Sequence, residues 1–243
     1  MDKTRKWHCL SAILFSGLFL SSCQDRIFDN PFDPAATEII FEIVNTIFTP
    51  AVMPLGLTWD GSTIWNVDGY SGVLYSLNRL NGTVVRSLST PMRLVSGITY
   101  DGQDLWICSE SEAEILKISL MTGEIQRRLS LQKGAFSSIV FARDGLWLAD
   151  TLTQKIIEVD PFSGEIRSSF AHPGTRVDGL AFDGAHFWLS DSTALMIYQV
   201  TSLGEVVRSF LSPGQSPRGL AHDGVYLWNA DGSQKIFQLK LQH

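Results

Sequence analysis

Short apolar runs separated by turn residues recur along most of the chain. Between Gly179 and Leu211 four such runs follow one another, G-L-A-F, H-F-W-L-S, L-M-I-Y-Q-V and E-V-V-R-S-F-L. Each run has the length of a β-strand, and the breaks contain Asp183-Gly184 and Gly204, residue types that favour tight turns. The pattern predicts four short antiparallel strands joined by turns.

The same pattern is written five times. Copies of G-L-A-F-D-G-A-H-F-W-L-S-D begin at Gly56, Gly97, Ser138, Gly179 and Gly219. Their tryptophans are 41, 41, 41 and 40 residues apart, at Trp65, Trp106, Trp147, Trp188 and Trp228. A period of about 40 residues with four strands per repeat is typical of propeller blades. We therefore predict an all-β protein, a five-bladed β-propeller of four-stranded antiparallel blades.

The two ends of the repeat region complete each other. The segment Glu42–Leu57 aligns without a gap on Glu205–Leu220, so it contains the last strand of a repeat that lacks its earlier part. The fifth copy reaches His243 without that strand. We expect the N-terminal strand to complete the last blade, which would close the ring and remove both open sheet edges. The predicted propeller covers residues 38–243.

The first 22 residues differ in kind from the rest. Lys3, Arg5 and Lys6 precede an apolar run from Leu10 to Leu20, which is shorter than the roughly 20 residues needed to span a bilayer. This arrangement predicts a secretory signal peptide over residues 1–22.

The segment ends in L-S-S-C, from Leu20 to Cys23, which resembles the lipobox of bacterial lipoproteins. The resemblance implies that Cys23 is acylated and becomes the N-terminus, anchoring the chain in a membrane. Gln24 follows the cysteine where an aspartate would favour retention at the inner membrane, so the resemblance implies the outer membrane. The alternative is a plain signal peptide with a chance cysteine. Residues 23–37 would form a tether, whose 14 residues after Cys23 could extend over about 45–50 Å and let the folded domain stand clear of the membrane.

Net charge and cysteine content narrow the possible partners. The chain has a formal net charge of −6, and removing the basic signal peptide leaves −8, so we expect no nucleic-acid partner. Cys9 would leave with the signal peptide and Cys23 would carry lipid, so Cys108 has no partner for an intramolecular disulfide. It occupies a small core position in the repeat.

Two sets of repeat positions are candidate sites. Aspartate stands three residues after four of the five tryptophans, at Asp68, Asp150, Asp191 and Asp231, with Ser109 in the second copy. Converging carboxylates could hold Ca²⁺, or each aspartate could bond to its own loop as an Asx turn. Because near-equivalence in every blade suits architecture better than chemistry, we favour the turn role and expect no required cofactor.

Positions where the copies differ are better candidates for function. The residue before the first-strand glycine should line the mouth of the central channel, and it is Leu55, Ser96, Ser137, Asp178 or Arg218. Asp178 and Arg218 belong to adjacent blades and could form an ion pair or present opposite charges to a ligand. The second copy adds an acidic loop, Ser109–Glu114. The third shifts its Asp-Gly turn by two positions, to Asp144 and Gly145.

The run from Leu55 to Tyr70, L-G-L-T-W-D-G-S-T-I-W-N-V-D-G-Y, resembles the opening blade of the plant-type glutaminyl cyclotransferases, which are five-bladed propellers. The general blade pattern is shared with other propellers of the NHL-like kind. The family's glutamine before the first-strand Gly-Leu is Leu55 here, and its catalytic glutamate is Asn66. An asparagine cannot transfer the protons that the cyclisation requires.

These observations predict a lipid-anchored envelope protein whose propeller is a non-catalytic binding module for an envelope protein or small ligand, with no catalytic residue assigned. The alternative is an enzyme, either of the glutaminyl cyclotransferase type or a metal-dependent hydrolase like the propeller lactonases, which use an acidic site in the channel. A shared fold does not by itself imply a shared function.

Overall fold

A computed structural model describes residues 41–242, which form twenty β-strands joined by turns and short loops. The predicted signal peptide, Cys23 and the tether lie outside the described residues. No element in the described part is a helix long and apolar enough to cross a bilayer.

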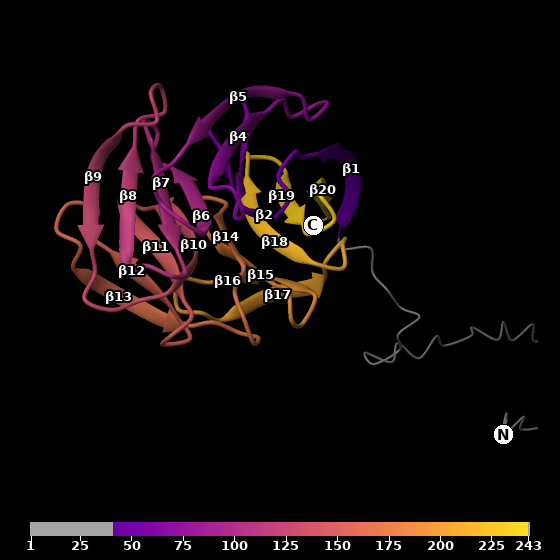
Figure 1. Ribbon diagram of the computed structural model, residues 1–243. Helices are drawn as coiled ribbons and strands as arrows, with labels where there is room; N and C mark the ends of the chain where they lie inside the picture. The colour runs from indigo at the N-terminus through magenta and orange to yellow at the C-terminus, as the bar shows by residue number, and fades with distance from the viewer. Residues whose placement is uncertain (1–40, 243) are drawn as a thin grey trace, which may run out of the picture. The chain divides into compact units, whose positions relative to one another are not determined.

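The strands form five four-stranded antiparallel sheets, confirming the predicted fold class (Figure 1). Blade 1 contains β2 (Pro54–Trp59), β3 (Ile64–Asp68), β4 (Val73–Leu77) and β5 (Val84–Ser89). Blade 2 contains β6 (Val95–Tyr100), β7 (Leu105–Ser109), β8 (Glu114–Ile118) and β9 (Ile125–Ser130). Blade 3 contains β10 (Phe136–Ala142), β11 (Gly145–Asp150), β12 (Lys155–Val159) and β13 (Ile166–Ala171). Blade 4 contains β14 (Gly179–Phe182), β15 (Phe187–Asp191), β16 (Met196–Val200) and β17 (Val206–Leu211). Blade 5 contains β18 (Pro217–His222), β19 (Leu227–Asp231), β20 (Lys235–Leu241) and β1 (Phe41–Phe48).

The blades form a closed ring because the first strand of each contacts the first strand of the next, from β2 through β6, β10, β14 and β18 back to β2. Blade 5 is completed by the N-terminal strand as predicted. Figure 1 shows indigo β1 beside yellow β20, and the two strands pair antiparallel from Phe41 opposite Leu241 to Phe48 opposite Lys235. The first and last strands of the repeat region thus pair with each other and close the ring.

Strand order gives the ring two distinct faces. One face, called the mouth face below, carries the loops between second and third strands and the links from each blade to the next. The opposite face, called the turn face, carries the tight turns after each first and third strand. Their glycines include Gly82, Gly123, Gly164 and Gly204, all with positive φ as the turn prediction requires.

The hydrophobic core consists of five clusters, each between two neighbouring blades. The five repeat tryptophans lie in these clusters with at most 5% of their surface exposed. They therefore pack the blades together and form no ligand platform.

Blade 3 departs from the other blades at its first turn. Arg143 and Asp144 both have positive φ, at 52° and 60°, which is the geometry of a two-residue hairpin turn. Gly145, which the shifted Asp-Gly pattern places in the turn, instead opens β11. Trp147 Nε1 accordingly donates to the carbonyl of Ala142 at 3.3 Å. In the other four blades the tryptophan N–H donates instead to the side chain of an aspartate five residues earlier.

Candidate functional site

The five mouth positions expected from the sequence line one cavity of about 340 Å³. Leu55, Ser96, Ser137 and Arg218 lie near the starts of first strands β2, β6, β10 and β18, and Asp178 immediately precedes β14. The ring places these starts around the channel on the mouth face. Positions about 40 residues apart in the chain are thereby brought into one site.

Asp178 is the centre of an ion-pair network in this cavity. Its side chain is only 4% exposed, and its Oδ1 accepts hydrogen bonds from Arg176 Nε at 2.8 Å and Arg218 Nη1 at 3.2 Å. Its Oδ2 accepts from the backbone N–H of Ser192 at 2.9 Å. The pairing of Asp178 with Arg218 across adjacent blades is thus present. The carboxylate holds two guanidinium groups at the rim of the mouth.

Arg176 and Glu110 extend the network across the ring. Arg176 Nη2 bonds to Glu110 Oε1, which joins the link between blades 3 and 4 to the loop after the second strand of blade 2. Burial lowers the pKa of Arg176, but bonds and charge from Asp178 and the charge of Glu110 outweigh it, so its pKa is raised. Neither residue was among the sequence candidates. The acidic Ser109–Glu114 loop was a signal for Glu110, whereas Arg176 lies in an irregular link that the repeat does not describe.

The two mouth serines, Ser96 and Ser137, form hydrogen bonds between neighbouring blades. Ser96 Oγ donates to the carbonyl of Phe136 in the next blade, and Ser137 Oγ donates to that of Val177. Both serines are buried. Their hydroxyl groups therefore tie neighbouring blades together and are already engaged by backbone carbonyls.

Part of the cavity lining is apolar. Leu55 of β2, Met53 of the link before β2 and Leu94 of the link between blades 1 and 2 contribute it. Met53 is 39% exposed and Leu94 is 55% exposed. The mouth thus combines two guanidinium groups with exposed aliphatic carbon.

The aspartates that end the second strands hydrogen-bond to loop backbone. Asp191 accepts from the N–H groups of Thr175, Arg176, Thr193 and Ala194 at 2.7–3.2 Å. Burial raises the pKa of Asp191, but these four bonds outweigh it and the pKa is lowered.

The other three accept equivalent bonds. Asp68 accepts from Met53 and Tyr70, Asp150 from Ala135 and Leu152, and Asp231 from Ser216 and Ser233. Residues 41–242 contain no group of three or more histidine, cysteine or acidic side chains placed to hold a metal ion. The hydrogen bonds of the four aspartates to loop backbone match the Asx-turn role favoured from the sequence.

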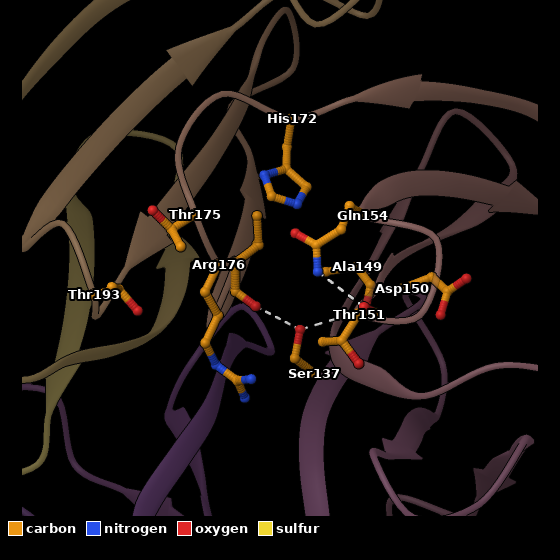
Figure 2. Close-up of a pocket in the computed structure, with 10 residues that line it drawn as sticks. Ser137, Ala149, Asp150, Thr151, Gln154, His172, Thr175, Arg176 and Thr193 are labelled. Atoms are coloured by element: carbon orange, nitrogen blue, oxygen red, sulfur yellow. Dashed lines mark hydrogen bonds between the residues drawn. The ribbon is translucent and has the colours of Figure 1, made fainter.

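A second cavity of about 220 Å³ lies beside the first, between blades 3 and 4. It shares Ser137 and Arg176 with the mouth cavity. Figure 2 shows His172 and Ser137 on opposite sides of this cavity. His172 Nδ1 bonds to the carbonyl of Pro173 at 3.0 Å, which engages that ring nitrogen.

Asn66 and Cys108 are both buried without exposed surface. Asn66 accepts a hydrogen bond from Thr49 Oγ1 at 2.7 Å and donates to the carbonyl of Gly56 at 3.1 Å. Burial raises the pKa of the Cys108 thiol to about 12, which is the behaviour of a core residue. Asn66, at the position of the family's catalytic glutamate, therefore joins strands.

Comparisons with known proteins support the fold. No protein-family model matches the chain, and no curated protein matches it. Among solved structures, the glutaminyl cyclase of Myxococcus xanthus superimposes with a TM-score of 0.71 at 14% identity, over 84% of this chain and 97% of the cyclase.

Two further solved structures match less closely. The virginiamycin B lyase of Staphylococcus aureus gives a TM-score of 0.51 at 23% identity, over 79% of this chain and 68% of the lyase. The β-propeller domain of Myceliophteria thermophila Cps50 (Swd1) gives 0.56 at 11% identity, over 83% of this chain and all of that domain. Identities this low establish shared fold alone. The resemblance to glutaminyl cyclotransferase propellers is thus confirmed at the level of the five-bladed fold.

Proposed function

We propose that this protein is a lipid-anchored component of the bacterial cell envelope whose propeller binds a ligand at the mouth without catalysing a reaction. The observation that carries the proposal is the mouth cavity, which contains Arg176 and Arg218, both held by Asp178, together with apolar side chains. A volume of about 340 Å³ is in the range of small-molecule sites. The occupant would be a small ligand or an exposed segment of an envelope protein.

The combination of charged and apolar lining residues favours a carboxylate attached to an apolar group. A guanidinium has five N–H donors, and Asp178 takes only one from each arginine. Donors left on Arg176 and Arg218 suit a planar carboxylate, while Leu55, Met53 and Leu94 suit an aliphatic side chain. The C-terminal residue of a peptide has both features.

The ionisable groups at the mouth favour binding over catalysis. A general acid or base must exchange a proton with its substrate. The Asp178 carboxylate is held by two arginines and a backbone N–H, and Glu110 is held by Arg176. Asn66 lacks a titratable group altogether.

N-acetyl-leucine and its amide form a matched pair of probes, because they differ only in the carboxylate. We expect calorimetry or chemical-shift titration to detect N-acetyl-leucine and to give an affinity at least about tenfold lower for the amide, since a charge-assisted bidentate bond is lost. Arg218→Gln should weaken binding of N-acetyl-leucine to the level of the amide. Equal binding of both probes would contradict the assigned ligand chemistry.

The second candidate is an enzyme of the glutaminyl cyclotransferase type, favoured by the fold shared with the Myxococcus xanthus cyclase. A peptide with N-terminal glutamine tests it directly through release of ammonia. Turnover that disappears in Asp178→Asn or Arg218→Gln would replace the binding proposal with this one.

A metal-dependent hydrolase is tested through stability. If the four aspartates serve their loops, Ca²⁺ or a chelator should change the melting temperature by less than about 1 °C, because mass action stabilises only a protein that binds the ion. A calcium-dependent gain of several degrees that is lost in Asp191→Asn would support the hydrolytic alternative.

The proposed anchor is acylation at Cys23, with the propeller facing the periplasm from the outer membrane. Intact-mass analysis of the membrane fraction should find a chain beginning at Cys23 and carrying fatty-acyl groups. The Cys23→Ser variant should lose these groups and leave the membrane fraction. Fractionation of the inner and outer membranes then tests the membrane assignment made from Gln24.

A further inference from the structure

Four exposed apolar residues occupy the same position in four blades. Each stands in the turn between the third and fourth strands, and each is 70–76% exposed; they are Leu80, Met121, Phe162 and Leu203. We call them the four tips. Large apolar side chains this exposed are ordinary when scattered singly, but recurrence at one repeat position is not scatter.

Hydrogen bonding shows that the four turns begin alike, although the turn of blade 4 closes over three residues and the other three close over four. In each, the N–H of the tip donates to a side-chain oxygen two residues earlier, on Asn78, Ser119, Asp160 or Thr201. In each, the turn glycine also donates to the carbonyl of that same residue. Because the blades are related by rotation about the ring axis, equivalent turns lie in one plane. The four tips therefore project from a single plane on the turn face.

The fifth equivalent position is where the N-terminal chain joins the ring. β1 is the fourth strand of blade 5, and it begins at Phe41 opposite Leu241 of β20. The predicted tether that follows Cys23 thus joins the propeller at the turn face. Four positions of the ring carry a tip, and the fifth receives the predicted tether.

Neighbouring blades contact three of these turns, and two of them place a guanidinium group beside the tip. Arg127 of β9 donates from Nη1 to the carbonyl of Phe162, and its Cζ lies 5.3 Å from that ring's centroid. Arg86 Nη1 of β5 lies 3.9 Å from Met121 Sδ. Asn45 of β1 donates to the carbonyl of Leu80, next to Arg79. An apolar group beside an arginine suits the boundary between headgroups and acyl chains.

We propose that the turn face docks on the bilayer surface, with the four tips inserted at the headgroup boundary and the mouth directed away from the membrane. This inference rests on the proposed anchoring at Cys23. The occupant is a bilayer because the tips are coplanar but a whole blade apart, whereas a protein interface needs a continuous buried patch. Docking also replaces the expectation that the domain stands clear on an extended tether.

The test separates docking from acylation. Residues 24–243, which include every strand of the ring, are given an N-terminal hexahistidine tag and bound to phosphatidylcholine vesicles that contain a nickel-chelating lipid. One fluorophore is placed through Thr122→Cys beside Met121 on the turn face, or through Ser233→Cys in the β19–β20 loop on the mouth face. Cys108 stays unlabelled because it is fully buried. A nitroxide attached to the lipid then quenches nearby fluorophores.

We expect at least threefold stronger quenching at position 122 than at position 233. Replacing all four tips by serine should equalise the two positions, while Val85→Ser with Val207→Ser on the outer strands should leave the difference intact. Equal quenching in the unmodified propeller, or stronger quenching at position 233, would overturn the docking proposal. Failure of acylation at Cys23 would appear separately, as loss of the untagged full chain from the membrane fraction.

Discussion

Each buried tryptophan brings a polar N–H into the core, and four of the five donate it to an aspartate five residues earlier. The bonds from Trp65, Trp106, Trp188 and Trp228 end on Asp60, Asp101, Asp183 and Asp223 at 2.7–2.8 Å. The repeat showed these aspartates only as turn residues. A buried donor left unpaired would cost about 1–3 kcal/mol, so the aspartate of the Asp-Gly turn also satisfies the core.

Asp183→Asn tests this role. Asp183 Oδ2 accepts from Trp188 and Gln199, and Oδ1 accepts from Ala185 and His186. An amide NH₂ would face a donor on one side or the other, so we expect the free energy of unfolding at pH 7 to fall by about 1–3 kcal/mol. Urea denaturation measures it. The matched control is Asp144→Asn in the exposed blade-3 turn, expected to change stability by less than about 0.5 kcal/mol.

The same residue predicts a pH dependence. Burial raises the pKa of Asp183, but bonds from the N–H groups of His186 and Ala185 and from Trp188 outweigh it, so the folded pKa lies below 3.8. A lowered folded pKa stabilises the protein above the unfolded pKa, and that contribution is lost as pH falls through the folded value. The deficit of Asp183→Asn relative to wild type should therefore shrink below about pH 4. A deficit independent of pH would contradict the assignment.

At the mouth, Asp178 and Arg218 offer a double-mutant cycle. The aspartate is buried and the arginine is 32% exposed, so solvent screens part of the attraction. We expect a coupling free energy of about 0.5–1 kcal/mol from urea denaturation of Asp178→Asn, Arg218→Gln and the double variant. A coupling near zero would mean that the pair has no structural role and serves only the ligand.

At the scale of elements, glycine lets the inner strands approach one another. A Cβ on Gly56 would lie 2.7 Å from Ile98 N of the next blade, and one on Gly97 would lie 2.8 Å from Ile139 N. Blade 3 has Ser138 at this position, and its Oγ accepts the N–H of Leu180 at 2.9 Å. The spacing between blades is thus set by bare backbone at most contacts.

Gly219→Ala should accordingly destabilise the ring. The added methyl group would lie 2.6 Å from Leu57 N and overlap the carbonyl of Leu55, and neither backbone atom can rotate away. We expect a loss of about 1–3 kcal/mol, measured by urea denaturation. Ser138→Gly at the equivalent position of blade 3 is the control, with a smaller loss of about 1 kcal/mol from one hydrogen bond. A neutral Gly219→Ala would mean that the blades can separate.

The sequence predicted the elements well because strand length and turn chemistry are local properties repeated five times. The strand β14 begins and ends where the G-L-A-F run does. The blade-3 turn was wrong by one residue, since Asp-Gly marks a turn in four blades, whereas there Arg143 and Asp144 form it. Which residue of a short polar stretch adopts positive φ depends on strand register, and register is a property of pairing.

At the scale of the whole molecule, one buried residue of β1 adds core packing to the strand pairing that closes the ring. Ile47 is 1% exposed and packs in the cluster between blades 5 and 1 with Leu57, Ile64 and Trp228. Its neighbours in the strand are exposed or half-buried. Ile47 is therefore the buried apolar side chain that β1 adds to the core between blades 5 and 1.

Ile47→Ala should lower the free energy of unfolding by about 2–5 kcal/mol through the cavity left behind. If the ring unfolds as one unit, tryptophan fluorescence and far-UV circular dichroism should shift together in urea. Leu88→Ala at the equivalent position of blade 1 is the control and should behave alike. A separate early transition for Ile47→Ala alone would show that blade 5 opens without the others.

The site was predictable only in part. Leu55, Ser96, Ser137, Asp178 and Arg218 were found because the ring brings equivalent positions together, and all five line the mouth. The two serine bonds recur one repeat apart, from Ser96 to Phe136 and from Ser137 to Val177, but the sequence does not show which carbonyl a hydroxyl group reaches. The repeat could not show that Arg176 bridges to Glu110, because this contact joins blades through irregular loops. Contacts that differ between blades carry no periodic signal.

The pairing of β1 with β20 has a consequence during synthesis. The ribosome releases β1 first and its partner last, since chains are made from the N-terminus. Blades 1 to 4 can form in order, while β1 keeps an unpaired edge and Ile47 has no β20 residue to pack against until Lys235–Leu241 emerges. The nascent chain therefore has one strand with unpaired backbone N–H and C=O groups for almost its whole translation. A chaperone that covers residues 41–48 would prevent this strand from pairing with another chain.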